Sequence, residues 1–276
     1  MKTILITGAN AGIGLATAQA LAKDHRLVLL CRDRQKAQQA VDSIKVIHPR
    51  ADIHLYIASL SDLAAVAAAA NTIVAHHPVI DVLVNNAGYF PTSITYTGDV
   101  ENTLYASHVG HMLLSLKLLP ALEASGEGRI INVSSGAHVA GRVKRFFTKV
   151  KGYNTLQAYA DAKLANILFT MVMCRQSPHV TSYALHPGVV KTSFDRNVGG
   201  LFKVLVTIVK PLFFITATDG ARTTLHLCQA AFADIKNHNG QYFDKAKPAR
   251  TNNRDITQAN AEWLWSKSMD LIKPYL

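Results

Sequence analysis

A tyrosine and a lysine stand four residues apart, Tyr159 and Lys163, within a segment whose pattern predicts a helix over Leu156–Cys174. Residues at i and i+4 lie on one helical face, one turn apart. A free tyrosine has a pKa of about 10, and a nearby ammonium group favours the tyrosinate and lowers that pKa. We therefore expect Tyr159 to exchange a proton with a substrate oxygen near neutral pH. An exposed helical pair is the alternative that this spacing alone leaves open.

A glycine-rich turn follows the first predicted strand and opens the first predicted helix. Glycine accepts positive φ and lets the backbone approach a phosphate closely. The helix that follows presents free N–H groups and the positive end of its dipole to an anion. Its GxxxGxG spacing differs from the commoner GxGxxG, so its place at a strand-to-helix junction carries much of the prediction. The residues predicted to bind a dinucleotide here are Gly8, Asn10, Ala11, Gly12, Ile13 and Gly14.

The end of the second predicted strand bears on the choice of cofactor. An acidic residue that would bind the adenosine ribose 2′-OH is absent there, and Cys31-Arg32 stands in its place. A guanidinium group suits a 2′-phosphate through charge-assisted, often bidentate hydrogen bonds. Arg32 therefore favours NADP(H), while NAD(H) stays an option because Asp33 and Arg34 lie close by. The alternative is that Arg32 is an ordinary solvated arginine.

Short apolar runs alternate with helical patterns along the chain. The runs predict strands over Thr3–Thr7, Leu27–Cys31, Ile53–Ile57, Val79–Val84, Arg129–Val133 and Val180–Leu185. Helices are predicted over Ile13–Asp24, Arg34–His48, from a Ser61 or Asp62 cap to His76, over Glu101–Leu119 up to Pro120, and over Leu156–Cys174. Continuous apolar strands are typical of a sheet covered on both faces. We predict an α/β fold with a doubly wound, Rossmann-like parallel sheet, as a single domain over residues 1–276.

A variable segment, residues 193–235, is predicted to be a helical substrate lid within this domain. Within it, Leu201–Ile215 places Lys203, Thr207 and Lys210 in one polar stripe on an otherwise apolar helix, which a proline ends or kinks. Such a helix suits a lid over an apolar pocket or an interfacial helix resting on lipid. A core helix with two surface lysines is the third interpretation.

The composition excludes several classes of protein. The chain has 276 residues, 49% hydrophobic and 17% charged, which is not the composition of a disordered chain. Three cysteines without a CxxC pattern favour a reducing, intracellular setting over a disulfide framework. The N-terminal segment does not resemble a signal peptide, and no stretch has the roughly 18 apolar residues that span a bilayer. We expect a cytoplasmic protein, with peripheral contact at a membrane surface as an option.

The net charge of +11 is spread along the chain. A surplus of this size suits nucleic acid, an anionic membrane surface or a phosphorylated ligand. No helix-turn-helix, zinc-ligand or aromatic-basic RNA pattern accompanies it. We therefore expect no nucleic-acid partner and assign the charge to solvated surface and to cofactor or membrane electrostatics.

Ordered motifs make the chain resemble the short-chain dehydrogenase/reductase family. The motifs are Thr7–Gly14, Asn85–Gly88, Asn132–Ser135, Tyr159–Lys163 and His186–Thr192. Each motif is weak by itself, but the set in this order is specific and covers about the first 190 residues. The resemblance implies an NAD(P)-dependent oxidoreductase that passes a hydride between the cofactor and an alcohol/carbonyl pair. Monomers and homodimers both fit the family.

The resemblance also assigns roles to residues. It makes Tyr159 the acid or base, and it lets Lys163 hold the nicotinamide ribose as well. It places the hydroxyl of Ser135, rather than that of Ser134, on the substrate oxygen. The expected cofactor contacts beyond the glycine turn are Arg32, Asn86, Ala87, Gly88, Tyr159, Lys163 and Thr192.

Finer features resemble the retinol-dehydrogenase-like branch of the family. They are Ser134–His138 followed by a long spacer, Lys163–Thr170, Val109–His111 and Gly240–Phe243. Members of this branch act on lipophilic alcohols and carbonyls such as retinoids. The resemblance therefore implies a retinoid-, steroid- or alkyl-carbonyl-like substrate.

Some positions depart from the family pattern. Ser107 stands where an asparagine usually helps hold a water that connects the lysine to solvent, so Ser107 is a candidate catalytic residue with a shorter reach. His108 or His111 either compensates or packs within the helix. Tyr56 replaces the usual aspartate beside the adenine; it contacts adenine or is a strand-end residue. Ala162 replaces a common serine. These departures leave an alternative function, a nucleotide-sensing binding module with impaired catalysis.

Overall fold

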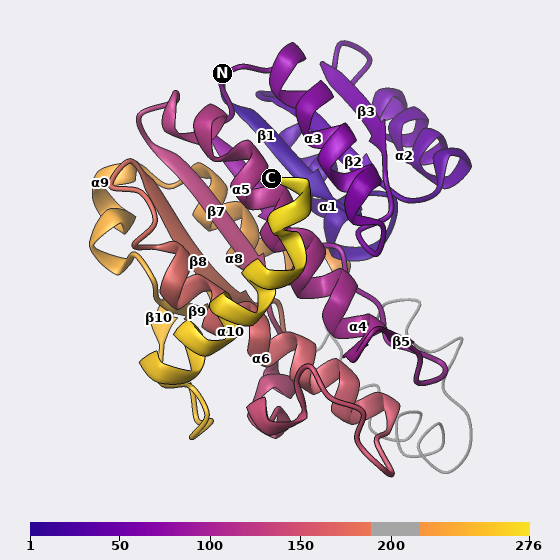
Figure 1. The fold of residues 1–276 in the computed structure, drawn as a ribbon. Helices are drawn as coiled ribbons and strands as arrows, with labels where there is room; N and C mark the ends of the chain where they lie inside the picture. The colour runs from indigo at the N-terminus through magenta and orange to yellow at the C-terminus, as the bar shows by residue number, and fades with distance from the viewer. Residues whose placement is uncertain (189–215) are drawn as a thin grey trace.

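The computed structural model describes residues 1–188 and 216–276 of the chain. An eight-stranded sheet runs through the centre in the order β10-β9-β8-β7-β4-β1-β2-β3 (Figure 1). Its strands are β1 (Thr3–Thr7), β2 (Arg26–Cys31), β3 (Ile53–Ile57), β4 (Val82–Asn85), β7 (Gly128–Val133), β8 (Val180–His186), β9 (Tyr242–Asp244) and β10 (Lys247–Ala249). Neighbours in this sheet pair in parallel, except β9 with β10. The predicted Rossmann-like parallel sheet is confirmed.

Helices cover both faces of the sheet. They are α1 (Gly12–Leu21), α2 (Arg34–Ile47), α3 (Leu63–His76), α4 (Asn102–Leu104), α5 (Gly110–Glu123), α6 (Thr155–Met173), α8 (Ala217–Gln229), α9 (Phe232–Ile235) and α10 (Gln258–Ile272). The helices α1 and α8 pack together on one face, and α3, α5, α6 and α10 cover the other (Figure 1). Within β1, Leu5 belongs to one core cluster and Ile4 and Ile6 to the other. This is why the strands are continuous apolar runs.

The strand order reverses between β1 and β4. The chain moves outward from β1 through β2 to β3, then crosses back to β4 and continues through β7, β8 and β9. In open parallel sheets, ligands bind outside the carboxyl ends of the strands at such a reversal. The topology therefore brings the turns after β1 and β4 together at one edge.

The predicted helix over Glu101–Leu119 is wrong in its details. Glu101 closes the hairpin of β5 (Tyr96–Thr97) and β6 (Val100–Glu101), and its buried carboxylate caps α4. A π-helical turn over Tyr105–Val109 then precedes α5. Pro120 lies inside α5 and does not end it, because the Ala124 N–H bonds the Pro120 carbonyl at 3.0 Å and completes a last turn. At α3, the N-cap is Asp62 rather than Ser61.

The part of the chain after residue 216 extends the core. Helix α8 packs on α1, and its Leu227 and Cys228 are buried in the same cluster as β1. Strands β9 and β10 widen the sheet, and α10 covers α6. The described part of the predicted lid segment, residues 216–235, thus lies in a helical layer, while residues 193–215 lie outside the described residues. In the part of the chain that the structure describes, we find no helix that could cross a membrane.

Candidate active site

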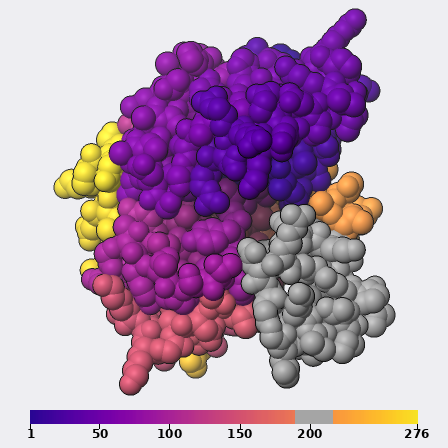
Figure 2. Space-filling model, turned by 90° about the vertical axis from the view of Figure 1, so that its right-hand side faces the viewer, coloured from indigo at the N-terminus to yellow at the C-terminus, as the bar shows by residue number. Residues whose placement is uncertain are grey.

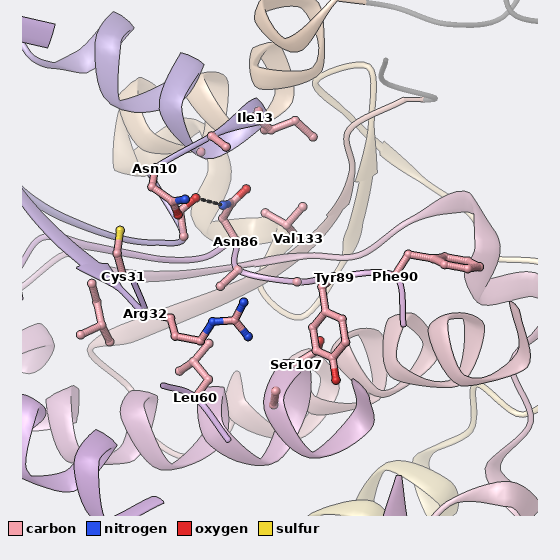
Figure 3. A pocket seen from close by; sticks show the side chains of 18 of the residues that line it. Asn10, Ile13, Cys31, Arg32, Leu60, Asn86, Tyr89, Phe90, Ser107 and Val133 are labelled. Atoms are coloured by element: carbon pink, nitrogen blue, oxygen red, sulfur yellow. Dashed lines mark hydrogen bonds between the residues drawn. The ribbon is translucent and has the colours of Figure 1, made fainter. Parts of the chain in front are cut away.

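A cavity of about 510 Å³ lies at the carboxyl ends of β1, β2, β4 and β7 (Figure 3). Figure 2 faces this side of the molecule, where the surface is hollowed between the indigo N-terminal segments and the magenta segments that follow β4. The predicted residues that line it are Gly8, Asn10, Ala11, Gly12, Ile13, Gly14, Arg32, Asn86, Ala87, Gly88, Ser107, Tyr159 and Lys163. The predicted contact Thr192 lies outside the described residues. Residues that lie far apart in the chain, from Gly8 to Lys163, thus line the same cavity.

The turn between β1 and α1 has the geometry that an anion site requires. Gly8 and Gly12 adopt φ of +67° and +56°, which L side chains rarely adopt. A Cβ on Gly14 would lie 2.6 Å from the Gly8 carbonyl oxygen, so α1 and the turn can approach only through glycine. The first turn of α1 has no side-chain cap and no acidic residue. Its free N–H groups therefore fit a pyrophosphate.

Asn86 joins the turn after β4 to the turn after β1. Its side-chain amide donates to the Thr7 carbonyl at 2.8 Å and more weakly to the Gly8 carbonyl at 3.4 Å. The Thr7 hydroxyl accepts the backbone N–H groups of Asn86 and Ala87 at 3.0 and 2.9 Å. These bonds hold the turn after β1 and the turn after β4 in one arrangement.

Arg32 projects into the cavity near Leu60 and Tyr89 (Figure 3). The adjacent Asp33 accepts the Lys36 N–H at 3.1 Å as the N-cap of α2, and its other oxygen lies 3.4 Å from the Lys36 ammonium. Asp33 is thus engaged with its own helix. Its carboxylate therefore opposes the binding of a phosphate beside Arg32 less than its sequence position suggested.

Helix α6 positions Tyr159 and Lys163. An Asn154–Gln157 capping box begins this helix, and its residues after the first turn are buried almost without a break. The Lys163 ammonium donates to the Val133 carbonyl at 2.9 Å and lies 5.6 Å from the Tyr159 ring centroid. Gly88 faces this ammonium, because a Cβ there would lie 3.1 Å from it.

The structure separates the two adjacent serines after β7. The Ser134 hydroxyl donates its hydrogen to the Lys163 carbonyl at 2.7 Å, and this bond joins the end of β7 to α6. The Ser135 hydroxyl forms a hydrogen bond with the side chain of Tyr159, and it accepts the Ala137 N–H at 3.2 Å. Ser135 is therefore the serine that lies beside the tyrosine hydroxyl.

One electrostatic expectation is wrong in this structure. We expected Lys163 to lower the pKa of Tyr159, but burial raises that pKa, and only the Ser135 hydrogen bond opposes the rise. The Lys163 ammonium lies 5.6 Å from the tyrosine ring centroid and donates to the Val133 carbonyl at 2.9 Å. Burial also lowers the pKa of Lys163 to about 8.

Two positions that depart from the family pattern, Ser107 and Tyr56, lie in different surroundings. Ser107 is buried in the π-helical turn and lines the cavity. Tyr56 is a strand-end residue: its hydroxyl lies between His76 Nδ1 at 3.0 Å and His77 Nε2 at 3.1 Å. The wall beside β3 is formed instead by four residues that sequence reasoning missed, Ala58, Ser59, Leu60 and Ser61.

Two aromatic side chains of the wall were also missed, Tyr89 and Phe90. They follow directly after Gly88, so their position behind the Asn-Asn-Ala-Gly motif was the available signal. The Phe90 ring centroid lies 5.6 Å from that of Tyr159. Phe90 thus gives the cavity an apolar surface next to the tyrosine.

This fold and this site define an NAD(P)-dependent dehydrogenase or reductase of the short-chain class. The sequence model of the family described as short chain dehydrogenase matches residues 2–200, and the chain belongs to that family. It is similar to retinol dehydrogenase 12 of Mus musculus, with 35% identity over 98% of this chain and 86% of the relative. It is also 36% identical to retinol dehydrogenase 13 of Homo sapiens, over 98% of this chain and 84% of the relative.

Solved structures agree with this fold. Levodione reductase matches with a TM-score of 0.70 at 18% identity, over 95% of this chain and 98% of its own. A putative NAD(P) dependent gluconate 5-dehydrogenase from Beutenbergia cavernae, solved with bound NADP, matches with a TM-score of 0.69 at 24% identity, over 88% and 94%. At these identities the likeness supports the fold alone.

Proposed function

We propose that this protein transfers a hydride between NADP(H) and a lipophilic alcohol/carbonyl pair. The observation that carries the proposal is the arrangement of Tyr159, Ser135 and Lys163 in and beside a cavity whose other end is the uncapped glycine turn. A proton-transfer group and a site for a dinucleotide phosphate thus share one space. The proposal includes a cytoplasmic location with peripheral membrane contact, and it accommodates a monomer or a homodimer.

The chain's own residues supply the proton chemistry. The nicotinamide cofactor, when bound, supplies or accepts the hydride. Tyr159 gives a proton to the carbonyl oxygen in reduction and takes it back in oxidation. Ser135 donates a hydrogen bond to the same oxygen and so stabilises the charge that develops there. Lys163 binds the nicotinamide ribose, and Ser107 stands at the point where a water would resupply the proton.

Arg32 sets the cofactor preference in this proposal. Its guanidinium projects into the cavity at the end of β2, where the adenosine ribose 2′-phosphate would lie. We expect Arg32→Gln to weaken NADPH binding by about tenfold or more, because a charge-assisted pair is lost. NADH binding should change by less than about twofold, since NADH lacks the 2′-phosphate that Arg32 would contact. Parallel fluorescence titrations with both nucleotides measure the difference.

The control for this experiment is Arg34→Gln. Arg34 is exposed at the start of α2, two residues away, and carries the same charge. Its replacement should leave the ratio of the two affinities unchanged. Equal losses of NADPH and NADH binding in Arg32→Gln, or no loss at all, would overturn the assignment of the 2′-phosphate to Arg32.

The lipophilic substrate class is supported by Phe90 and by the relatives named as retinol dehydrogenases. The Phe90 ring gives a long apolar substrate a surface to pack on beside Tyr159. We expect Phe90→Ala to raise KM for a retinoid or long alkyl aldehyde by about tenfold, because apolar contact area is lost. Phe90→Leu, which keeps much of that area, should raise it by less than about threefold.

A short polar carbonyl compound is the internal control, since it has little apolar area to pack against Phe90. Steady-state kinetics of the wild type and both variants with long and short substrates separate the effects. If KM rises equally for both substrates, Phe90 acts on the shape of the site and not on the substrate class. In that case the lipophilic assignment loses its structural support.

A further inference from the structure

His111 connects three parts of the candidate active site that the motifs describe separately. It is 2% exposed and lies in α5, directly after the π-helical turn. Its Nδ1 lies 2.9 Å from the Ser107 carbonyl oxygen, and its Nε2 lies 2.9 Å from the Thr7 hydroxyl. The side chain therefore reaches from the helix that carries Ser107 to the strand that ends in the glycine turn.

The partners of these atoms allow only one placement of the protons. The Thr7 hydroxyl oxygen already accepts two backbone N–H groups, from Asn86 and Ala87, so its hydrogen is the one it can give. It donates that hydrogen to Nε2 of His111, which must be the unprotonated nitrogen. The proton then sits on Nδ1, which donates to the Ser107 carbonyl.

The electrostatic surroundings keep this tautomer. Burial is the main cause that lowers the pKa of His111 to about 4, and the nearby Lys163 lowers it further. The ring is therefore neutral over the physiological range. A charged ring would donate from both nitrogens and take the acceptor away from the Thr7 hydroxyl, leaving it the more distant Val84 carbonyl at 3.4 Å.

The three connected pieces all face the cavity. The glycine turn begins at Gly8, the residue after Thr7, and the turn after β4 carries Asn86 and Ala87. Ser107 stands in the opposite part of the wall. His111 bonds both the Ser107 carbonyl of its own helical segment and the Thr7 hydroxyl at the end of β1, so it joins two parts of the site.

We propose that His111 is a positioning residue that orients the Thr7 hydroxyl and thereby fixes both nucleotide-facing turns relative to Ser107 before the cofactor binds. The inference rests on the proposed function in one respect, namely that the cavity binds a nicotinamide nucleotide. It goes further by assigning the preorganisation of that site to a residue outside the cavity wall.

The experiment compares two replacements of similar polarity. His111→Gln extends an amide oxygen to the place of Nε2 and can accept from Thr7. His111→Asn has its amide at the place of Nδ1, keeps the bond to the Ser107 carbonyl and leaves the Thr7 hydroxyl without its acceptor. We expect NADPH to bind about tenfold more weakly to His111→Asn, and to stay within about threefold of wild type for His111→Gln. Fluorescence titration with NADPH is the readout.

A double-mutant cycle locates the effect at the Thr7 contact. In a Thr7→Val background the hydroxyl is absent, so His111→Asn should add less than about twofold to the loss of NADPH affinity. The matched control is His108→Asn, because His108 is equally buried three residues earlier, in the π-helical turn, but bonds Ser268 at 2.7 Å. It should lower the free energy of unfolding while leaving NADPH affinity within about twofold.

The outcomes separate this inference from the proposed function. If wild-type protein binds neither NADPH nor NADH, the proposed function fails. If wild type binds NADPH but the Asn and Gln variants lose equal affinity, or if His108→Asn loses as much, the positioning role is overturned and His111 is a packing residue. Rescue by glutamine together with a vanishing effect in the Thr7→Val background supports the role.

Discussion

Replacing Tyr159 by phenylalanine is expected to lower kcat by about 10³-fold, because the substrate oxygen loses the phenol proton donor that hydrogen-bonds Ser135. The ring stays in place against Phe90, so we expect NADPH affinity to change by less than about twofold. Turnover of a carbonyl substrate and a titration with NADPH, made on the same preparation, measure the two quantities. A fall in kcat at constant nucleotide affinity identifies a group that acts in the chemical step.

The matched control is Tyr56→Phe. It removes a phenol from the same protein, but that hydroxyl lies between His76 and His77. We expect its kcat to stay near that of wild type. Retained turnover in Tyr159→Phe would overturn the assigned role. Nucleotide binding by the wild type without turnover on a broad panel of carbonyls would favour the alternative of a nucleotide-sensing module.

The second large effect is on stability in acid. His108 is 1% exposed, and burial is the main cause that lowers its pKa from 6.5 to about 3, with His111 lowering it further. The unfolded chain binds a proton at this position below pH 6.5, whereas the folded chain does so only near pH 3. Protonation of His108 therefore costs no free energy of unfolding well above pH 6.5, and the free energy of unfolding falls as the pH drops below that value. Between pH 6.5 and 4 the free energy of unfolding should fall by about 3 kcal/mol for this histidine alone.

Urea unfolding between pH 7 and pH 4 tests this with His108→Gln. Glutamine can still reach Ser268, but it binds no proton, so the decline with acid should be shallower by about 1.4 kcal/mol per pH unit. The control is His179→Gln, at an exposed histidine, for which we expect the pH dependence of the wild type. A His108→Gln variant that loses stability in acid as steeply as wild type would show that the buried neutral ring is not the source.

Much of the fold followed from local pattern. The predicted strands are all present, and their ends differ most at β4, which begins at Val82 rather than Val79. Parallel strands covered on both faces must be apolar throughout, so their runs are visible without any knowledge of the neighbours. Strands β9 and β10 have three residues each and were not predicted, because so short a run has no periodicity to detect.

The sequence by itself determined the chemistry-bearing groups of this protein. A glycine turn at a strand-to-helix junction, an i, i+4 tyrosine–lysine pair and an arginine at a strand end each follow from residue type and local spacing. The structure places all of them at the carboxyl edge of one sheet, since parallel strands end there together.

Only the tertiary structure decided which of two adjacent residues lies at the site and which side chains the others contact. The choice of Ser135 over Ser134 depends on α6, whose Lys163 carbonyl accepts the Ser134 hydroxyl. The place of Tyr56 depends on His76 and His77 at the end of α3. The bonds of His111 depend on Thr7 in β1 and on Ser107 in a π-helical turn that the sequence pattern does not indicate. Hydrogen bonds between distant segments settle each of these, and a one-dimensional pattern contains neither their distances nor their directions.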